Sequence, residues 1–140
     1  DDAVWVALAD GTVARIDPAT NQVVATVPVG GAPQGVLIAG GSVWVSNVDD
    51  GTVTKIDPAT DEVVDTFEVG SEPSGLAFEA GVLWVARTGD GSVSALDPGT
   101  GEILATVPAG DRPTGLAAGA GALWVTNTSS ASVTRIDPTG

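Results

Sequence analysis

The sequence predicts an all-β fold built from repeated four-stranded units. Three observations carry this prediction. First, one pattern of residues recurs along the 140-residue chain with a period close to 40. Second, short runs rich in Val, Ile and Thr alternate with clusters of Gly, Pro, Asn and Asp, which is typical of strands separated by turns. Third, no segment has the 3.6-residue periodicity of an amphipathic helix.

Residues that recur in register mark the repeat. The four Trp residues lie 39, 40 and 40 positions apart, and the four Asp-Pro pairs begin 40 positions apart. This periodicity divides the single domain 1–140 into repeats of approximately 1–32, 33–72, 73–112 and 113–140. The repeated positions are Trp5, Trp44, Trp84 and Trp124, together with Asp17, Asp57, Asp97 and Asp137.

Each complete repeat contains four short segments with strand character. The first follows a Pro-x-Gly sequence, as in Gly115–Gly119, and the second carries the Trp, as in Ala122–Asn127. The third ends at Asp-Pro, as in Ser132–Asp137, and the fourth alternates apolar residues, as in Val23–Val29. A four-stranded repeat of about 40 residues has the size of one β-propeller blade. We therefore expect a partial β-propeller of antiparallel blades.

The strand count predicts an open ring. The chain begins at a second strand and ends at a third strand, so the repeats hold three, four, four and three strands, or 3.5 blades. Propellers have about 4 to 8 blades, and an open one exposes apolar blade faces and strand edges. The chain is then a processed or excised part of a larger propeller, as the missing initial Met suggests, or it self-associates, two chains completing one ring. A strained four-bladed monomer is the least favoured alternative.

Composition excludes several functions. The chain has no His and no Cys, which removes a Ser-His-Asp triad, a thiol nucleophile and a zinc site made of imidazole or thiolate ligands. Its formal net charge is -13, which disfavours nucleic acids and anionic membrane surfaces as partners. No apolar run approaches the roughly 18 residues of a membrane helix, so membrane insertion is not expected.

Three strings of residues carry a family resemblance. They are Leu-Trp-Val-Thr-Asn at 123–127, Val-Thr-Arg-Ile-Asp-Pro at 133–138, and Val-Val-Ala-Thr-Val-Pro-Val-Gly at 23–30, followed by Pro-x-Gly. They resemble the YVTN family of β-propeller repeats, with Trp in place of the usual Tyr, and are similar to virginiamycin B lyase-like and NHL-like propeller repeats. The resemblance covers essentially the whole chain and implies the propeller fold. Lyase-like propellers imply a His-assisted, metal-dependent elimination, which a chain without His does not carry over.

The repeated Trp and Asp residues have structural interpretations. We expect the Trp side chains to pack between blades, with each indole N–H finding one partner, rather than to form a carbohydrate platform. We expect the Asp of each Asp-Pro pair to cap its turn rather than to act as a catalytic acid. In three repeats a cation stands two residues before this Asp, at Arg15, Lys55 and Arg135, which predicts a repeated ion pair on one strand face.

Departures from the repeat give the candidate ligand-binding residues. Arg87 stands where two other repeats have Asn47 and Asn127, and Arg112 is a second isolated cation beside a turn. Both can receive an anionic group, although neutralisation of an acidic surface is the favoured interpretation. Together with Asp90 they form the candidate ligand-binding set Arg87, Asp90 and Arg112; no catalytic or metal-binding residue is predicted.

The acidic loops Asp49-Asp50-Gly51 and Gly89-Asp90-Gly91 resemble fragments of a calcium loop. Calcium takes about six to eight oxygen ligands, more than such loops offer, so we interpret them as hairpin turns. No cofactor is predicted, and weak calcium binding is left as an alternative.

The sequence thus predicts a non-enzymatic β-propeller scaffold for binding or interaction, in an extracellular or periplasmic setting. Its expected partners are a second copy of the chain or the remainder of a larger propeller, with the bound protein or small ligand unspecified. Two alternatives remain: a metal-dependent lyase- or hydrolase-like enzyme that uses carboxylates, and an excised or designed repeat unit with no function beyond folding and assembly.

Overall fold

The computed structural model describes residues 2–139 and contains only strands and turns. Fourteen strands form four antiparallel sheets of three, four, four and three strands, which confirms the predicted fold class and strand count. Within residues 2–139 no helix is long and apolar enough to cross a membrane. The strands are β1 (Val4–Leu8), β2 (Thr12–Asp17), β3 (Gln22–Pro28), β4 (Pro33–Ala39), β5 (Ser42–Asn47), β6 (Thr52–Asp57), β7 (Glu62–Glu68), β8 (Pro73–Glu79), β9 (Val82–Arg87), β10 (Ser92–Leu96), β11 (Ile103–Pro108), β12 (Pro113–Gly119), β13 (Ala122–Asn127) and β14 (Ser132–Ile136).

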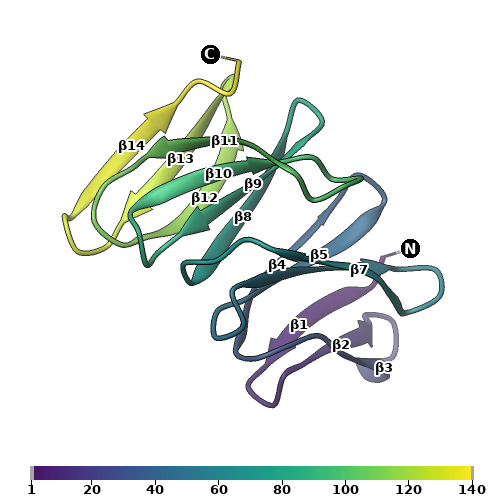
Figure 1. Ribbon diagram of the computed structural model, residues 1–140. Helices are drawn as coiled ribbons and strands as arrows, with labels where there is room; N and C mark the ends of the chain where they lie inside the picture. The colour runs from purple at the N-terminus through teal and green to yellow at the C-terminus, as the bar shows by residue number, and fades with distance from the viewer. Residues whose placement is uncertain (1, 140) are drawn as a thin grey trace.

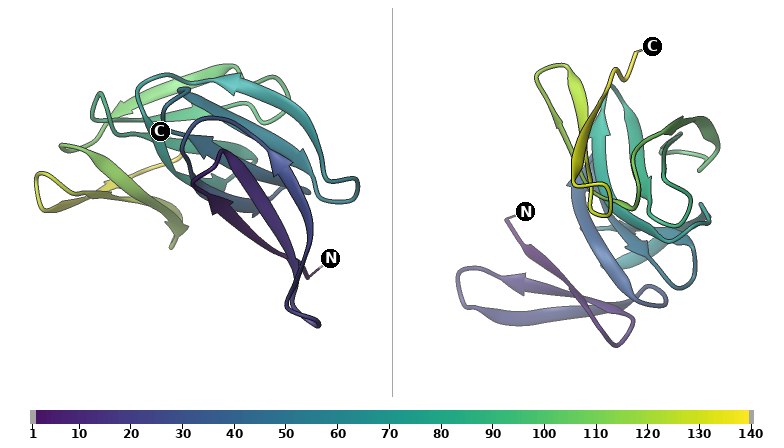
Figure 2. Two further views of the ribbon diagram at one scale, coloured as in Figure 1. Left: turned by 90° about the horizontal axis from the view of Figure 1, so that it is seen from below. Right: turned by 90° about the vertical axis from the view of Figure 1, so that its left-hand side faces the viewer.

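Each sheet is one blade, and the blades follow one another along an open arc (Figure 1). Blade 1 is β1–β3, blade 2 is β4–β7, blade 3 is β8–β11 and blade 4 is β12–β14. Within each blade the strands that follow one another in sequence pair with each other, and the inner strand β8 contacts both β4 and β12. Among the described residues, blade 1 has no inner strand and blade 4 has no outer strand. The two incomplete blades lie at opposite ends of the arc (Figures 1 and 2).

Strand alternation gives each blade two different faces. In β5, Val43 and Val45 point to one side of the sheet while Trp44 between them points to the other. We call the side with the two valines, or their equivalents, the head face, and the side with the Trp the tail face. A tight turn after the second strand preserves this register: Gly51 has a φ of 67°, and its N–H donates to the Asn47 carbonyl at 3.0 Å.

The core consists of three clusters, each formed where the tail face of one blade packs on the head face of the next. The Trp of the second strand, a Val of the third strand and an apolar residue of the fourth strand contribute one half, and three aliphatic side chains of the next blade contribute the other. The facing sets are Trp5, Val13 and Val27 on Val43, Val45 and Ile56; Trp44, Val53 and Phe67 on Leu83, Val85 and Leu96; and Trp84, Val93 and Val107 on Leu123, Val125 and Ile136.

The inner strands approach so closely that the sequence needs glycine between them. A Cβ atom on Gly75 would collide with the carbonyl oxygen of Thr114 in the next inner strand and would lie 2.9 Å from the backbone nitrogen of Leu116. A Cβ atom on Gly115 would instead meet the Thr126 hydroxyl at 2.6 Å, a side-chain atom of its own blade. The glycine of the Pro-x-Gly pattern therefore sets the spacing of the blades around the axis.

Gly75→Ala is expected to destabilise the protein by about 2 to 3 kcal/mol, because backbone atoms on a neighbouring strand cannot move aside as a side chain can. Gly115→Ala is the matched control and is expected to cost less, because blade 4 has no following inner strand within the described residues. Urea unfolding of both variants measures the difference. Equal stability of the two would contradict the proposed role of Gly75.

Candidate functional site

The crossovers between blades and the turns after the second strands meet at one end of the blades. We call this end the crossover face; its crossovers are residues 29–33, 69–73 and 109–113. In blade 2 the Val48 N–H donates to the Ala32 carbonyl at 3.0 Å, and the Asp49 N–H donates to the Gly31 carbonyl at 3.2 Å. The same two hydrogen bonds recur in blades 3 and 4, so each crossover is tied to the blade that it enters.

Each crossover is also tied to the blade that it leaves. The Val29 N–H donates to the Gly11 carbonyl at 3.0 Å, and the pairs Val69–Gly51 and Ala109–Gly91 repeat this contact at 2.9 and 2.8 Å. Backbone hydrogen bonds at both ends leave the crossover little conformational freedom. The loops at this face therefore form a rigid frame, in contrast to loops joined only by their own ends.

The residue before the proline of each crossover lies in the left-handed region of backbone conformation. Ala32, Glu72 and Arg112 have φ values of 52°, 53° and 52°, and each directly precedes a proline. A non-glycine residue in this region is uncommon and strained, and such strain tends to gather at functional sites. All three side chains are exposed, and they differ: Ala32 is small, Glu72 is acidic and Arg112 is basic. The same backbone conformation therefore carries a different side chain in each crossover.

The candidate residues Arg87 and Asp90 bind each other. The Arg87 Nη2 lies 2.9 Å from an Asp90 carboxylate oxygen and 3.2 Å from the Ser71 hydroxyl, while Nη1 lies 3.3 Å from the Ser94 hydroxyl. The guanidinium thereby links the turn of blade 3 to the crossover that enters it. Arg112 lies on the following crossover with its side chain exposed. The structure thus brings two of the three candidates together, and both take part in holding the loops.

The equivalent asparagines explain what Arg87 replaces. The Asn127 Nδ2 donates to the hydroxyls of Ser132 and Thr134 at 3.2 and 2.9 Å, and its Oδ1 accepts the Gly110 N–H at 3.0 Å. One buried amide therefore joins the second strand, the third strand and the crossover from the previous blade. Asn47 makes the same pair of donor contacts to Thr52 and Thr54.

Arg87→Asn is expected to change the free energy of unfolding by less than about 1 kcal/mol, because Ser92, Ser94 and Gly70 stand where the partners of Asn127 stand in blade 4. Arg87→Ala is expected to cost about 1 to 3 kcal/mol, since it removes the donors without replacement. Denaturant unfolding of the two variants gives the comparison. A larger loss for Asn than for Ala would refute the equivalence.

The Asp-Pro turns lie at the opposite end of the blades. Asp17, Asp57, Asp97 and Asp137 each accept, at 2.7 to 2.9 Å, the backbone N–H of the residue two positions later, as expected of turn caps. At Asp97 the N–H groups of Gly99 and Thr100 hold the pKa of the carboxyl below its ordinary value of 3.8. At Asp137 the backbone N–H and hydroxyl of Thr139 likewise lower the pKa.

Two of the cations before these turns, Arg15 and Lys55, reach the next blade. Arg15 forms an ion pair with Asp61 at 3.2 Å, and the Lys55 Nζ donates to the Pro98 carbonyl at 3.0 Å while lying 5.2 Å from the centre of the Trp44 ring. The sequence predicted a pair within one strand, to the Asp two residues later. At Arg15 and Lys55 the contacts lie instead with the following Asp-Pro turn, which blade packing brings within reach of the cation. At Arg135 the positive charge does act on the Asp two residues later, because it contributes to the lowered pKa of Asp137.

The Trp side chains follow the blade packing. Trp5, Trp44 and Trp84 are buried between blades, and the Trp44 indole N–H donates to the Ala39 carbonyl at 3.1 Å. The Trp84 indole nitrogen is buried without a hydrogen-bond partner, so the expected indole partner is missing there. Trp124 differs because no blade covers the tail face of blade 4, although its N–H donates to the Gly119 carbonyl at 3.0 Å.

The pKa of Asp97 is expected to lie below 3.8 in an NMR pH titration. Because folding lowers this pKa, the stability that it contributes is present above the unfolded-state pKa of about 4 and is lost as the pH falls through the folded-state value. Lys55→Met is expected to raise the pKa only slightly, since the charge of Lys55 is the smallest cause of the shift and the backbone amides are the largest. A return to the ordinary value in this variant would show that the charge dominates.

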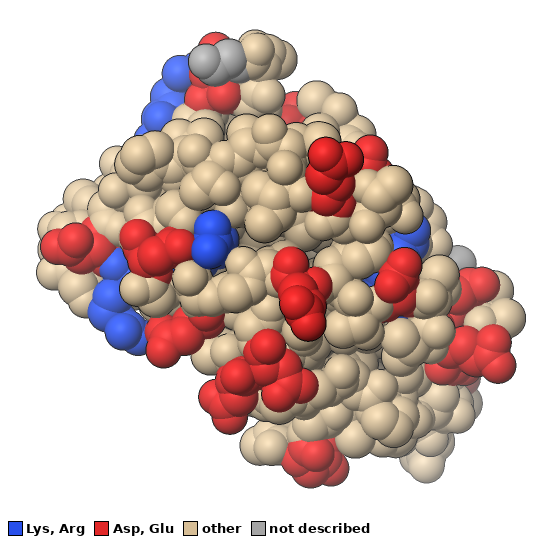
Figure 3. Space-filling view, viewed as in Figure 1, with Lys and Arg blue, Asp and Glu red and all other residues tan. Residues whose placement is uncertain are grey.

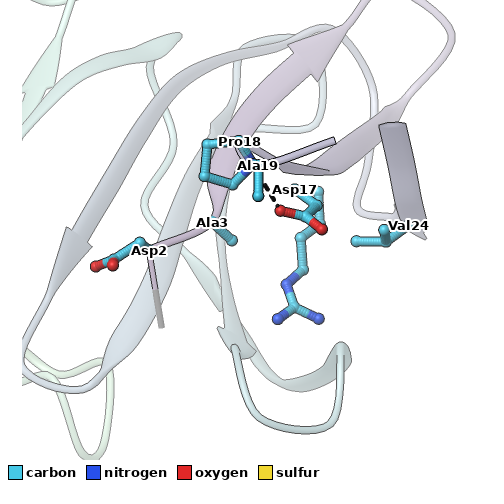
Figure 4. A pocket seen from close by; sticks show the side chains of 7 residues that line it. Asp2, Ala3, Asp17, Pro18, Ala19 and Val24 are labelled. Atoms are coloured by element: carbon cyan, nitrogen blue, oxygen red, sulfur yellow. Dashed lines mark hydrogen bonds between the residues drawn. The ribbon is translucent and has the colours of Figure 1, made fainter. Parts of the chain in front are cut away.

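A cavity of about 510 Å³ lies in blade 1 near its Asp-Pro turn (Figure 4). The Asp17 carboxylate beside it caps the Ala19 N–H at 2.9 Å, and Arg15 bonds Asp61 of the next blade. These polar groups already serve the fold. Within residues 2–139 no cluster of three or more His, Cys, Asp or Glu side chains is arranged to hold a metal ion. Sequence reasoning missed this cavity, since only sheet pairing brings its walls together: Asp2, Ala3, Arg15, Asp17, Pro18, Ala19 and Val24.

Acidic side chains are spread over the surface and outnumber basic ones (Figure 3). At the crossover face the exposed acids include Asp49, Glu72 and Asp111. Asp50 is also there, but its carboxylate accepts the Gly31 N–H at 2.9 Å and supports the crossover. This face therefore combines a rigid backbone with exposed acidic side chains that are available to a partner.

Comparison with known proteins places the fold. No family model and no curated protein matches the chain. Among solved structures, virginiamycin B lyase from Staphylococcus aureus aligns with a TM-score of 0.85 at 19% identity, over 99% of this chain and 50% of that one. A streptogramin B lyase structure gives 0.86 at 18%, covering 99% and 49%. The computationally designed Ika4 protein gives 0.82 at 20%, covering 96% and 84%.

These similarities establish the class of protein. The chain has the β-propeller repeat fold that its sequence predicted, and it spans about half the length of the lyases that it matches. Identities near 20% establish the fold and leave function to the chemistry of the chain itself.

Proposed function

We propose that this chain is a non-enzymatic scaffold that uses its crossover face to bind a cationic partner. The observation that carries the proposal is the double anchoring of each crossover, which fixes strained, exposed positions such as the acidic Glu72 in place. A rigid frame lowers the entropy cost of binding. The acidic surface attracts cations and repels phosphate-rich partners.

The absence of His supports a binding role over the lyase alternative. One of the similar structures is a catalytically inactive S. aureus virginiamycin B lyase, with quinupristin, in which a histidine is replaced by alanine. This chain has no His at any position.

We propose an extracellular or periplasmic setting, in keeping with a chain that has no Cys to oxidise and an acidic surface. The proposal also includes self-association, for which the two end blades provide the support.

A second candidate is a repeat unit that serves folding and assembly alone. The designed Ika4 protein favours it, because this chain covers 84% of that one. The two candidates differ in what they predict for ligand binding. A scaffold binds at one end of its blades, whereas a unit that only assembles shows no localised response to a cationic probe.

Addition of decalysine to the ¹⁵N-labelled protein at low salt is expected to shift the amide signals of residues 29–33, 69–73 and 109–113. The triple variant Asp49→Asn, Glu72→Gln, Asp111→Asn is expected to bind about tenfold more weakly, since three surface charges at about 0.5 kcal/mol each amount to that factor. Added salt is expected to weaken binding because it screens exposed charges.

The matched control is Glu62→Gln, Glu79→Gln, Glu102→Gln, which removes the same charge at the opposite end of the blades. It is expected to bind decalysine almost as well as the unmodified chain. The proposal would be refuted if the amide shifts were spread evenly over both ends of the blades, or if the two triple variants weakened decalysine binding equally. Either result would show that decalysine responds to the net charge of the protein rather than to a site.

A further inference from the structure

The two ends of the arc expose the two halves of a blade interface. The tail face of blade 4 presents Trp124 and Val133, which are 40% and 62% exposed. The head face of blade 1 presents Val4 and Val6, which are 47% and 38% exposed. Exposed apolar side chains gathered on one sheet face mark an interaction surface.

Inside the arc every equivalent of these side chains is buried. Val13, Val53 and Val93 occupy the position of Val133 and are fully buried, each against the following blade. On the other side, the equivalents of Val4 and Val6 are also fully buried: they are Val43 and Val45, Leu83 and Val85, and Leu123 and Val125. The exposed faces therefore have the residue types that already form three interfaces in this molecule.

From this equivalence we propose that the tail face of one copy of this chain packs on the head face of a second copy. The contact is head-to-tail, so each copy uses one face of each kind, and two copies make two such junctions. Two chains then supply eight blade positions, within the range of about 4 to 8 blades found in closed propellers. This inference rests on the self-association included in the proposed function, and it adds which surfaces meet and in what order.

The basic residue at the proposed junction has equivalents at two of the internal interfaces. Arg15 and Lys55 each reach the Asp-Pro turn of the next blade, and the positive charge of Lys55 contributes to the low pKa of Asp97 in that turn. Arg135 is the exposed equivalent on blade 4. In the head-to-tail contact it faces the Asp17–Pro18 turn of the second copy, as Arg15 and Lys55 face the turns of the blades that follow them.

The shape of the arc favours a second copy over closure of the chain on itself. Blade 1 and blade 4 lie at opposite ends, and their exposed faces are separated by the two complete blades (Figure 2). Packing of faces leaves the strand edges as they are, because blade 1 still lacks an inner strand and blade 4 an outer one. The junction blades of the ring are therefore three-stranded.

Light scattering during size-exclusion chromatography tests the inference. A closed dimer has twice the 13.8 kDa mass of the chain, or 27.6 kDa. Val133→Asp is expected to weaken association by at least about tenfold, because it places an unpaired charge in an apolar contact. Val6→Asp is expected to do the same from the other face. Circular dichroism is expected to be unchanged in both, since each side chain is exposed in the single chain.

Val64→Asp is the matched control, because Val64 is 57% exposed but lies on the outer strand β7, away from both end faces. It is expected to leave the dimer intact. Mixing Val133→Asp with Val6→Asp is expected to restore a 1:1 pair, since one intact tail face still meets one intact head face.

Three results would overturn the inference: a monomer at every concentration, growing oligomers instead of a closed dimer, or a dimer that Val133→Asp disrupts and Val6→Asp does not, which would indicate tail-to-tail packing. The decalysine titration is read from amide signals of the crossovers. It therefore succeeds or fails independently of the mass measurement, and the two proposals are separable.

Discussion

The structure depends on one repeated contact, in which the tail face of a blade packs on the head face of the next. The Trp of the second strand and a buried β-branched residue of the third form one half, and three aliphatic side chains form the other. Because the halves differ, the contact has a direction. The glycine between inner strands allows the faces to close, and in blades 1 and 2 the basic residue of the third strand contacts the next Asp-Pro turn.

The sequence predicted the architecture well because the features that define the repeat depend on residues close together in the chain. Alternation, Gly turns and the Asp-Pro caps depend on residues within a few positions of one another, as at Asp97 and Gly99. The partner of Arg15 could not be found in this way, since Asp61 lies in another blade and becomes close only when the sheets pack. Trp124 is the converse case: its exposure follows from counting blades, although its local sequence matches that of buried Trp44.

The candidate site was predicted in part, and for a physical reason. Departures from the repeat identified Arg87 and Arg112, because a residue type that differs from those at the equivalent positions of the other repeats stands out. Sequence could not show that Arg87 and Asp90 bind each other, nor that Ala32, Glu72 and Arg112 share a strained backbone conformation. The crossovers are held by hydrogen bonds within two different blades, and these contacts are set by tertiary structure rather than by residue type.

The crossovers have a further consequence for how the interfaces are held. Each internal interface is spanned by a short covalent segment, such as residues 29–33, so its two faces experience an effective concentration in about the millimolar range. A junction between two chains has no such tether and must form at the concentration of the protein itself. In the proposed dimer, side chains of the same type therefore act in two ways: those within one copy are held together by the chain, and those between copies associate according to the protein concentration.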